Sequence, residues 1–347
     1  MKKYNVGIVG YGWAATAHIP AINATTLGQV TAVCSARKLD AAELSAKYGS
    51  PIRLYNELDE LLANPAIHVV SLCGLPSRRP GQAARAARAG KHLVLEKPLC
   101  LSLKDLRAMH QAVKQTGVKT CVCFECRFSS QMVATRAVID AGLLGALHYG
   151  EVDYYHGIGP WYSQFQWCAR QEEGGSSLLE GGCHALDALL LYLGGDVAEV
   201  ASYGARSQNR LFAPYEYPGT TVTILKFKNG SAGKCASSID CLQPYYFHTH
   251  LVGSSGSLLD NKFHSTVLGT GKQGWNTLAV RLLDSGDVSD HPYQTQFQAF
   301  LDALDQDRPM PLTSFDDAAK THEVIFAADR SVQLGRPVKL PLADESM

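Results

Sequence analysis

The sequence predicts an α/β protein in two parts, an N-terminal doubly wound parallel sheet and a C-terminal α+β part with a large, open, mostly antiparallel sheet. Strand-like and helix-like segments alternate over the first 125 residues, and long strand-like segments joined by short turns follow. The 347 residues are also many for a single hydrophobic core. We therefore expect one domain over residues 1–125 and a second over residues 126–347.

The strands of the first part are almost continuously apolar, which is typical of strands covered by helices on both sheet faces. The predicted strands are Tyr4–Val9, Val30–Cys34, Val69–Leu72, His92–Leu95 and Lys119–Phe124. The predicted helices between them are Ala14–Asn23, Asp40–Tyr48, Asn56–Ala63, Pro80–Ala89 and Leu103–Gln115.

After Arg127 the pattern changes to long strands joined by turn signals such as "KNG" and "GSSG". The predicted strands are Leu147–Tyr155 and the segments 197–205, 220–227, 230–239 and 246–254. The predicted helices are Ser130–Ala141, Ser177–Leu193, Tyr293–Gln306 and Phe315–Leu334. We expect the last of these helices to pack back on the first domain.

Charge and hydropathy exclude two classes of protein. Lys+Arg and Asp+Glu are both 32, and a formal net charge of zero argues against nucleic-acid binding. No apolar run is long enough to span a membrane. The start, "MKKYNVGIVGYG", has too short an apolar stretch for a signal peptide, so we expect a cytoplasmic protein.

The chain has 10 cysteines, which we expect to be reduced and mostly buried in a cytoplasmic protein. The segment "TCVCFECRF" brings Cys121, Cys123 and Cys126 close together and suggests a metal site. However, it alternates like a strand, and no second Cys/His cluster follows at zinc-finger spacing. We interpret it as a strand packed with small thiols and expect no metal.

The segment "VGIVGYGWAATAH" contains the pattern G-x-G-x-x-A, with Gly10, Gly12 and Ala15, between the first strand and the first helix. In this position the pattern is typical of a Rossmann dinucleotide site. Gly10 permits a tight turn, Gly12 lets a pyrophosphate approach the helix start, and Ala15 allows close packing. Trp13 and Ala14 open the helix and are expected beside the cofactor.

The end of the second strand distinguishes NAD from NADP. NAD sites usually carry an acidic residue there, which binds the ribose 2′-hydroxyl. Here the position holds Ser35, and Arg37 follows. Serine and arginine suit a 2′-phosphate, so the cofactor is NAD(P), with NADP favoured over NAD. The alternative is that Arg37 is a solvated loop charge.

The tripeptide Glu96-Lys97-Pro98 follows an apolar strand, where ligands of open α/β sheets bind. Lys97 could donate to a substrate oxygen and stabilise the negative charge that develops during hydride transfer. Glu96 could pair with a ribose hydroxyl or fix the loop. Leu75 and Pro76, in the loop after the neighbouring strand, are expected to contact the cofactor.

A second group of polar residues lies on the mostly apolar predicted helix 177–193. Glu180, His184 and Asp187 are spaced to share one helix face, and Ser176 or Ser177 can cap the helix. Ionisable groups on a buried helix are costly unless they have a function, and histidine is the commonest general base. A structural His–Asp pair and a metal pair remain alternatives, although no third ligand is evident.

With these segments placed, the chain resembles the Gfo/Idh/MocA family of oxidoreductases over nearly its whole length. The resemblance lies in "GIVGYGWAATAHIPA", "AGKHLVLEKP", "GGSSLLEGGCHALD" and the segment from "FQAFLDALDQDRP" to the end. It implies a Rossmann domain, a C-terminal sheet that often forms homodimers or homotetramers, and NAD(P)-dependent chemistry on a sugar or polyol. The family's lysine and catalytic histidine fall on Lys97 and His184.

The chain departs from the family pattern at two places. Glu180 stands four residues before the histidine, where the family often has Asp. Pro80 stands where the family commonly has His, and Arg78 and Arg79 add charges beside it. The first departure changes the reach of the group that orients the histidine.

We interpret the chain as an NAD(P)-dependent dehydrogenase or reductase acting on a CH–OH group of a sugar, glycoside or polyol. His184 would take the hydroxyl proton, Lys97 would polarise the same oxygen, and Glu180 would position the histidine or a substrate hydroxyl. Asp187 would orient the histidine, contact the substrate or only close a helix contact. The loop "DYYHGIGPWYSQFQW" contains four candidate residues for lining the sugar, namely Tyr155, His156, Trp161 and Trp167. The alternative is that these aromatic side chains belong to the core.

Two other functions remain open. Some enzymes of this kind hold NAD tightly and cleave or rearrange a glycoside through transient oxidation, without net redox change. Others are non-catalytic sensors that bind the dinucleotide as a ligand. The presence of both Lys97 and His184 argues against a sensor.

Overall fold

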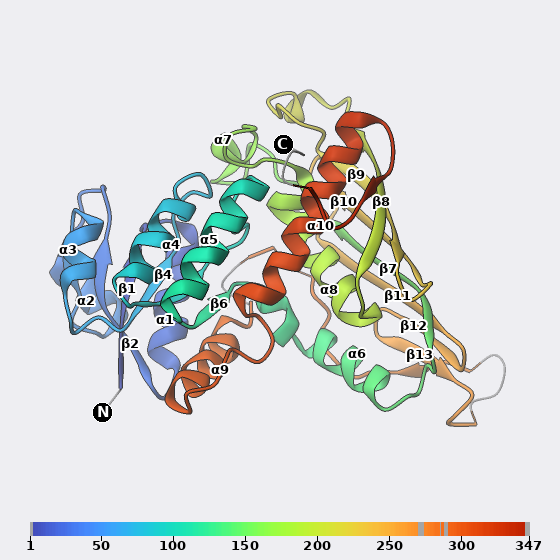
Figure 1. The fold of residues 1–347 in the computed structure, drawn as a ribbon, viewed down its shortest axis with the longest axis horizontal. Coiled ribbons are helices and arrows are strands. Elements are labelled where there is room, and N and C mark those ends of the chain that lie inside the picture. Colours follow the sequence, from blue (N-terminus) through green and yellow to red (C-terminus); the bar gives the residue numbers. More distant parts are fainter. Residues whose placement is uncertain (1–2, 270–273, 285, 288–290, 344–347) are drawn as a thin grey trace. The chain divides into compact units, whose positions relative to one another are not determined.

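The computed structural model describes residues 3–269, 274–284, 286–287 and 291–343 (Figure 1). The chain forms two compact units. Unit 1 consists of Met1–Phe128 and Asp287–Ala319, and unit 2 consists of Ser129–Gly286 and Lys320–Met347. The first segment of unit 1 ends at Phe128, close to the boundary expected at residue 125. Unit 1 also includes the later segment Asp287–Ala319, which was expected in the second domain.

Unit 1 is built on a six-stranded sheet with the order β3-β2-β1-β4-β5-β6. All of its strand pairs are parallel, so the predicted doubly wound parallel sheet is confirmed. Its strands are β1 (Tyr4–Val9), β2 (Gly28–Cys34), β3 (Arg53–Tyr55), β4 (Val69–Leu72), β5 (His92–Leu95) and β6 (Thr120–Val122). β3 was not predicted from the sequence, because three residues are too few to show a periodic pattern.

The helices of unit 1 are close to their predicted bounds. They are α1 (Trp13–Ala24), α2 (Ala41–Tyr48), α3 (Leu58–Ala63), α4 (Arg79–Arg88), α5 (Leu103–Thr116) and α9 (Tyr293–Asp305), with a 3₁₀ turn η1 (Glu125–Phe128). Tyr293, Phe297 and Phe300 of α9 are buried in one cluster with Ile8 of β1 and Ile19 of α1. This packing places the segment 287–319 in unit 1.

The register of the parallel sheet brings four strand ends to one edge. Val9 pairs with Cys34 and with Leu72, and Leu72 pairs with Leu95. These four residues end β1, β2, β4 and β5. The loops that follow the strands therefore start side by side, at the edge where open α/β sheets bind ligands.

Unit 2 contains a nine-stranded sheet with the order β14-β13-β12-β11-β7-β10-β9-β8-β15. Only β10 and β7 pair in parallel among its described strands, which confirms the predicted mostly antiparallel sheet. The strands are β7 (Leu147–Tyr155), β8 (Val197–Ala205), β9 (Thr220–Phe227), β10 (Ala232–Ser238), β11 (Tyr246–Gly253), β12 (Gly256–Leu259), β13 (Lys262–Ser265), β14 (Asn276–Thr277) and β15 (Val338–Lys339).

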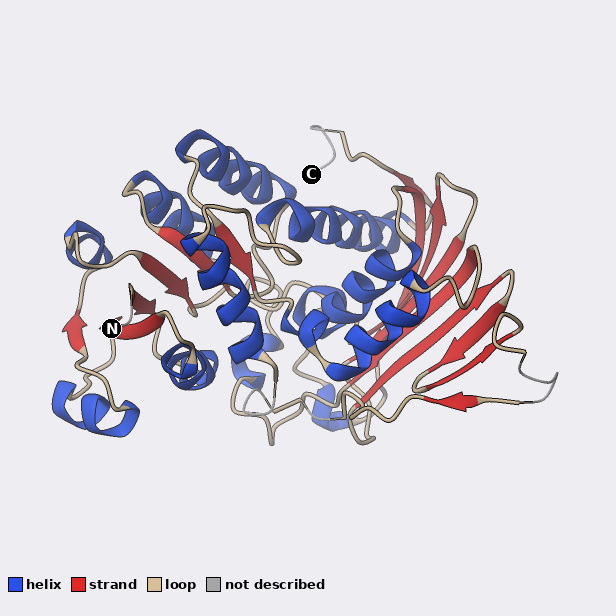
Figure 2. Ribbon diagram, turned by 90° about the horizontal axis from the view of Figure 1, so that it is seen from below, coloured by secondary structure: helices blue, strands red, loops and turns tan. Residues whose placement is uncertain are grey.

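Helices cover one face of this sheet (Figures 1 and 2). In β9, Thr221, Thr223 and Leu225 are buried, whereas the alternate residues Val222 and Ile224 are exposed, as expected of a sheet packed on one side. The helical segments are α6 (Ser130–Asp140), α7 (Phe165–Cys168), the π-helical turn η2 (Leu178–Gly182), α8 (Cys183–Leu193), the 3₁₀ turn η3 (Arg210–Phe212) and α10 (Phe315–Leu334), which begins in unit 1.

Two further observations concern the whole chain. Within the described ranges, no helix is both long enough and apolar enough to cross a membrane. All ten cysteines are free thiols, and Cys121, Cys123 and Cys126 are buried. Burial raises the pKa of Cys121 and of Cys123, so both remain protonated. The burial of all three thiols agrees with packing in the core, and Cys121 lies in β6 whereas Cys126 lies in η1.

Candidate active site

The turn between β1 and α1 has room for a ligand. Gly10 has a φ of 89°, and a Cβ there would lie 2.8 Å from the backbone nitrogen of Gly74, so only glycine fits. A Cβ at Gly12, by contrast, would meet nothing within 4 Å. Gly12 caps α1, whose first turn carries no acidic residue, and Ala15 is fully buried beneath it. An open helix start of this kind fits a dinucleotide pyrophosphate.

The other residues expected at the cofactor lie around this turn. Trp13 and Ala14 are half-buried at the start of α1. At the end of β2, the Ser35 hydroxyl oxygen accepts a hydrogen bond of 3.1 Å from the backbone N–H of Arg37, whose side chain is exposed. Ser35 can still donate its own proton, and Arg37 is available to an anionic ligand.

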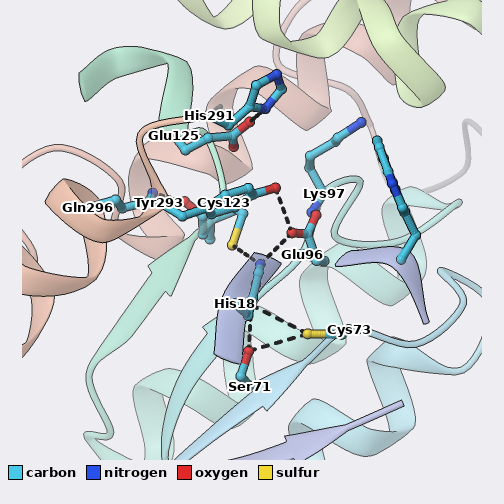
Figure 3. Close-up of polar contacts among 12 residues, drawn as sticks. His18, Ser71, Cys73, Glu96, Lys97, Cys123, Glu125, His291, Tyr293 and Gln296 are labelled. Atoms are coloured by element: carbon cyan, nitrogen blue, oxygen red, sulfur yellow. Dashed lines mark hydrogen bonds and ion pairs between the residues drawn. The ribbon is translucent and has the colours of Figure 1, made fainter. Parts of the chain in front are cut away.

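Lys97 leaves the sheet directly after β5, in a loop with a cis Lys97–Pro98 peptide bond. The Lys97 side chain is half-buried, and its backbone N–H donates to Oε2 of Glu96 at 3.0 Å. Figure 3 shows the lysine side chain extending away from the Glu96 carboxylate. The residue is therefore anchored through its backbone, while its amine extends from the sheet edge.

Glu96 is buried and bound by side chains far from it in the sequence (Figure 3). Its Oε1 lies 2.7 Å from Nε2 of His18 and accepts a 3.1 Å hydrogen bond from the Tyr293 hydroxyl. Nδ1 of His18 lies 2.9 Å from the Ser71 hydroxyl and 3.4 Å from the Cys73 sulfur. These contacts hold Glu96 in the loop, and its pairing with a ribose hydroxyl stays a prediction.

The two partners in this pair are charged. Burial alone would lower the pKa of His18, but Cys73 and Glu96 raise it to about 10. Burial alone would raise the pKa of Glu96, but His18, Lys97 and Arg79 lower it to about 2. The pair is therefore an ion pair near neutral pH.

The loop on the other side of Lys97 is held by Arg79. This arginine is only 2% exposed and donates to the carbonyl oxygens of Gly74, at 2.6 Å, and of Pro98. It joins the loop after β4 to the loop after β5, which gives a structural role to one of the two arginines beside Pro80. Leu75 is half-buried and Pro76 is buried within the same β4–α4 loop.

In unit 2, Glu180, His184 and Asp187 are 5%, 4% and 1% exposed. The helix predicted over 177–193 is confirmed in its bounds, but its first turn is π-helical: Glu180 lies in this turn and the other two residues lie in α8. A Cβ at Gly181 would lie 2.4 Å from the ring of Tyr154 in β7. This tight contact lies at the π-helical turn, which is wider than an α-helical turn. Turns of this kind are common at functional sites.

Glu180 is surrounded by weakly acidic groups. Its Oε1 accepts a hydrogen bond of 3.0 Å from the thiol of Cys168, at the end of α7. Burial is the main cause that raises the pKa of both Tyr215 and Tyr217, and the charge of Glu180 is the second cause. Their hydroxyls therefore stay protonated. These hydroxyls donate to the carbonyl oxygens of Ile158 and Cys168, whereas the Cys168 thiol donates to Glu180 itself.

Asp187 has a structural contact. Its Oδ1 accepts a 2.8 Å hydrogen bond from the Thr321 hydroxyl of α10. Ser176 caps the start of the helical segment, because its hydroxyl accepts from the backbone N–H of Leu179 at 3.2 Å. The neighbouring Ser177 hydroxyl instead lies 2.9 Å from the Thr221 hydroxyl of β9.

The four aromatic residues expected to line a substrate site are not grouped together. Nδ1 of His156 lies 3.0 Å from the hydroxyl of Tyr154, on the sheet face that packs against η2 and α8. Tyr155 lies on the opposite face and stacks on Tyr246 with ring centres 6.2 Å apart. Trp161 is 56% exposed, and Trp167 is half-buried in α7.

Comparison with known proteins decides the family. Residues 4–124 match the model described as an oxidoreductase family with an NAD-binding Rossmann fold, GFO_IDH_MocA. Residues 132–259 match the model of the GFO/IDH/MocA C-terminal domain. The chain belongs to the Gfo/Idh/MocA family. The resemblance inferred from the sequence motifs is confirmed.

Relatives within the Gfo/Idh/MocA family share about a quarter of their residues with this chain. The scyllo-inositol 2-dehydrogenase (NAD(+)) of Bacillus subtilis is 26% identical over 287 residues, 81% of this chain and 80% of that protein. The myo-inositol 2-dehydrogenase of Thermotoga maritima is 24% identical over 336 residues, 96% of this chain and 98% of that protein. The predicted enzyme class, a dinucleotide-dependent dehydrogenase or reductase acting on CH–OH groups, is confirmed.

Solved structures of the Gfo/Idh/MocA family show the same fold. A levoglucosan dehydrogenase in complex with NADH and L-sorbose matches with a TM-score of 0.86 at 20% identity, covering 99% of this chain and 100% of that chain. A probable dehydrogenase from Thermotoga maritima matches with a TM-score of 0.82 at 24% identity, covering 97% and 98%. The predicted fold class is confirmed.

Three residues of the candidate site were not singled out from the sequence of this Gfo/Idh/MocA protein: His18, Tyr293 and Cys168. His18 could have been found, because it follows Ala15 by three residues and must face the sheet from α1. Tyr293 and Cys168 carry no such signal. Tyr293 contacts Glu96, which is 197 positions away along the chain, and Cys168 contacts Glu180, which is 12 positions away.

Proposed function

We propose that the chain transfers a hydride between the nicotinamide of NAD(P) and a CH–OH carbon of a sugar, glycoside or polyol, or the corresponding ketone. The observation that carries the proposal is the anchored Lys97 at the sheet edge where the open turn at Gly12 also lies. The inositol dehydrogenases among the relatives support this substrate class.

Lys97 and His184 divide the proton chemistry in this proposal. The bound nicotinamide supplies or accepts the hydride. The Lys97 ammonium donates to the substrate oxygen and stabilises its developing negative charge. His184 accepts the hydroxyl proton during oxidation and returns it during reduction, as a general base and acid near neutral pH. Glu180, which accepts from the Cys168 thiol in unit 2, positions His184 or a substrate hydroxyl.

The residues that line the substrate are proposed more narrowly than the sequence suggested. His156 is retained because Tyr154 links it to the face that carries the Glu180 turn. Trp161 and Trp167 remain candidates as aromatic surfaces for sugar C–H groups. Tyr155 is left out because it lies on the other sheet face, and Asp187 is assigned to the contact with Thr321 rather than to substrate.

For the cofactor, we propose NADP in preference to NAD. Ser35 stands at the end of β2 with its hydroxyl able to donate, and the exposed Arg37 follows it. Both suit a 2′-phosphate. Dissociation constants for NADP and NAD, measured for the wild type and Arg37→Ala, test this choice. We expect the variant to lose the preference for NADP, and an unchanged ratio would refute the role of Arg37.

The function is tested by measuring reduced nicotinamide with each cofactor and a panel of sugars, glycosides and inositols. We expect stoichiometric reduction of NAD(P) by at least one member of the panel. Cleavage of a glycoside without net reduction would instead identify an enzyme that oxidises its substrate only transiently. Dinucleotide binding without turnover of any substrate would identify a sensor. Either of the last two results contradicts the proposal.

We also propose that the chain forms a homodimer or homotetramer through the sheet of unit 2. Tyr203, Val222 and Ile224 are 71%, 39% and 47% exposed on β8 and β9. Exposed apolar side chains on adjacent strands are typical of interaction surfaces. Burial of this face in a second copy would remove them from water.

A further inference from the structure

We infer that the sheet of unit 2 carries a binding site for a divalent transition-metal ion, formed by Glu151 of β7 and by His248 and His250 of β11. One ligand atom of each residue lies within 4.8 Å of the others. All three side chains are half-buried in the single chain. They lie on the same sheet face as Ile224, because Lys234 pairs with both Ile224 and Glu151, so an ion enters from the face that the proposed assembly would cover. The inference does not depend on the proposed substrate or cofactor, and it differs from the expectation from the sequence that no metal is bound.

The pairing of the two strands places these side chains next to one another. In the antiparallel β7–β11 pair, His250 is opposite Glu151 and His248 is opposite Asp153. Alternate residues of a strand point to the same face, so the two histidines and the two carboxylates share one face. Val152 and Leu251, on the other face, are fully buried. The ligands therefore project from rigid strands rather than from loops, which reduces the cost of ordering them.

One of the histidines is already oriented by a second carboxylate. Nδ1 of His248 lies 3.1 Å from Oδ1 of Asp260 and 2.9 Å from the hydroxyl of Tyr246. Asp260 also accepts from the backbone N–H of Thr249 at 2.9 Å. Nδ1 is thus the nitrogen that carries the proton, and Nε2 is left to coordinate. A carboxylate behind a ligating histidine is the usual arrangement in protein metal sites.

The charges around the cluster attract a cation. Glu151, Asp153 and Asp260 provide three carboxylates, and Lys234 is the ammonium that lies against two of them. Lys234 is 2.6 Å from Oε1 of Glu151 and 2.7 Å from Oδ2 of Asp153. Lys234 can therefore keep its bond to Asp153 while the Glu151 carboxylate rotates away to coordinate a metal ion. The Tyr149 hydroxyl, which donates to Oε2 of Glu151 at 2.9 Å, is displaced in the same step.

The ligand set selects the kind of ion. Two imidazoles and one carboxylate suit Zn²⁺ and the neighbouring divalent metals Co²⁺, Ni²⁺ and Cu²⁺, whereas Mg²⁺ and Ca²⁺ require oxygen ligands. Three protein ligands leave a coordination position for water. All of the ligands come from one chain, so a second copy is not needed to complete the site.

The experiment uses full-length protein that has been stripped with a chelator and then titrated with Zn²⁺ and, as a spectroscopic probe, with Co²⁺. We expect one Zn²⁺ per chain and visible absorption bands of low-coordinate Co²⁺. Glu151→Gln and His250→Ala should each weaken Zn²⁺ binding by at least about 100-fold, because each removes a direct ligand. Asp260→Asn should weaken it by about 10–100-fold, as expected for a residue that only orients a ligand.

His148→Ala is the matched control, since His148 is an exposed histidine on the same strand, three positions before Glu151. It should bind Zn²⁺ like the wild type. Melting curves of each variant without metal show whether it is folded. The inference is overturned if the folded wild type binds no Zn²⁺, if Glu151→Gln keeps wild-type affinity, if His148→Ala loses as much affinity as His250→Ala, or if one ion binds per two chains.

Discussion

The position of Lys97 is set by contacts of its two neighbours in the chain. Glu96 is bound by His18 and Tyr293, and the carbonyl oxygen of Pro98 accepts from Arg79. A catalytic amine must be held in place to act in the transition state, and these contacts do so without using the amine itself. Substitutions at His18 and Arg79 should therefore affect turnover although neither residue is assigned a chemical step.

Arg79→Met is predicted to lower both stability and turnover. The methionine keeps part of the apolar stem but leaves the carbonyl oxygens of Gly74 and Pro98 without their donor. We expect a loss of about 1–3 kcal/mol in the free energy of unfolding, and a lower kcat with a smaller change in the dissociation constant of the dinucleotide. Urea unfolding and steady-state kinetics measure both. The adjacent Arg78→Met is the control, because Arg78 is exposed, and equal effects of the two substitutions would contradict the assignment.

His18→Gln is predicted to change how stability depends on pH. The glutamine can still donate to Glu96 but cannot ionise. The pKa of His18 is raised from 6.5 to about 10, so the ion pair contributes fully below pH 6.5 and is lost as pH rises toward 10. Across that range the free energy of unfolding of the wild type should fall by on the order of 1 kcal/mol per pH unit from this group.

The difference in stability between the wild type and His18→Gln should therefore shrink with rising pH. Unfolding by urea at several values from about pH 6 to about pH 9 measures it. A difference that stays constant or grows would show that His18 is neutral in the folded protein.

Among the elements, the strands of both sheets were predictable because burial on one or two faces leaves a clear apolar pattern. β1, β4, β5 and β7 have the predicted bounds. The differences fall where the local pattern does not decide, namely the short strands β3, β12, β13, β14 and β15, which were not predicted, and the π-helical turn that carries Glu180. The wider turn accompanies packing against Tyr154 of β7, a contact between segments that are separate in the sequence.

The candidate site was predictable to a similar extent. The turn at Gly10–Gly12, the strand-end lysine and the helix with His184 carry motifs that are local in the sequence. The groups that support them do not, because His18 and Tyr293 reach Glu96 across 78 and 197 positions. The sequence therefore carried motifs for the residues proposed to contact ligands, but not for the residues that hold Glu96 in place.

The turn between β1 and α1 yields a prediction that separates folding from binding. Gly12→Val should fold normally, because its Cβ meets nothing within 4 Å and its φ of −121° is open to any residue. It should weaken dinucleotide binding by at least about tenfold, because the side chain fills the space proposed for the pyrophosphate.

Gly10→Ala should instead destabilise the fold by about 1–3 kcal/mol. Fluorescence titrations with NADPH and NADH, and unfolding without cofactor, check both; normal binding by Gly12→Val would refute the assigned site.

For the whole molecule, the proposed assembly depends on the exposed face of the sheet in unit 2. Ile224→Glu introduces a charge among exposed apolar side chains of β8 and β9. We expect it to shift the protein from dimer or tetramer to monomer in light scattering, because burying an unpaired carboxylate is costly. Lys104→Glu, at an exposed position on α5 and outside this sheet, is the control for charge. A monomeric wild type, or an unchanged mass of Ile224→Glu, would contradict assembly through this face.

The measurement that tests the central claim most directly is the turnover of Lys97→Ala with whichever substrate of the panel reduces NAD(P). We predict a kcat lower by about 10²–10³-fold, because the lysine stabilises charge that develops only in the transition state. The dissociation constant of the dinucleotide should stay within about tenfold of the wild type. Lys104→Ala, an exposed lysine on α5, should behave like the wild type. Near-normal turnover by Lys97→Ala would contradict the account.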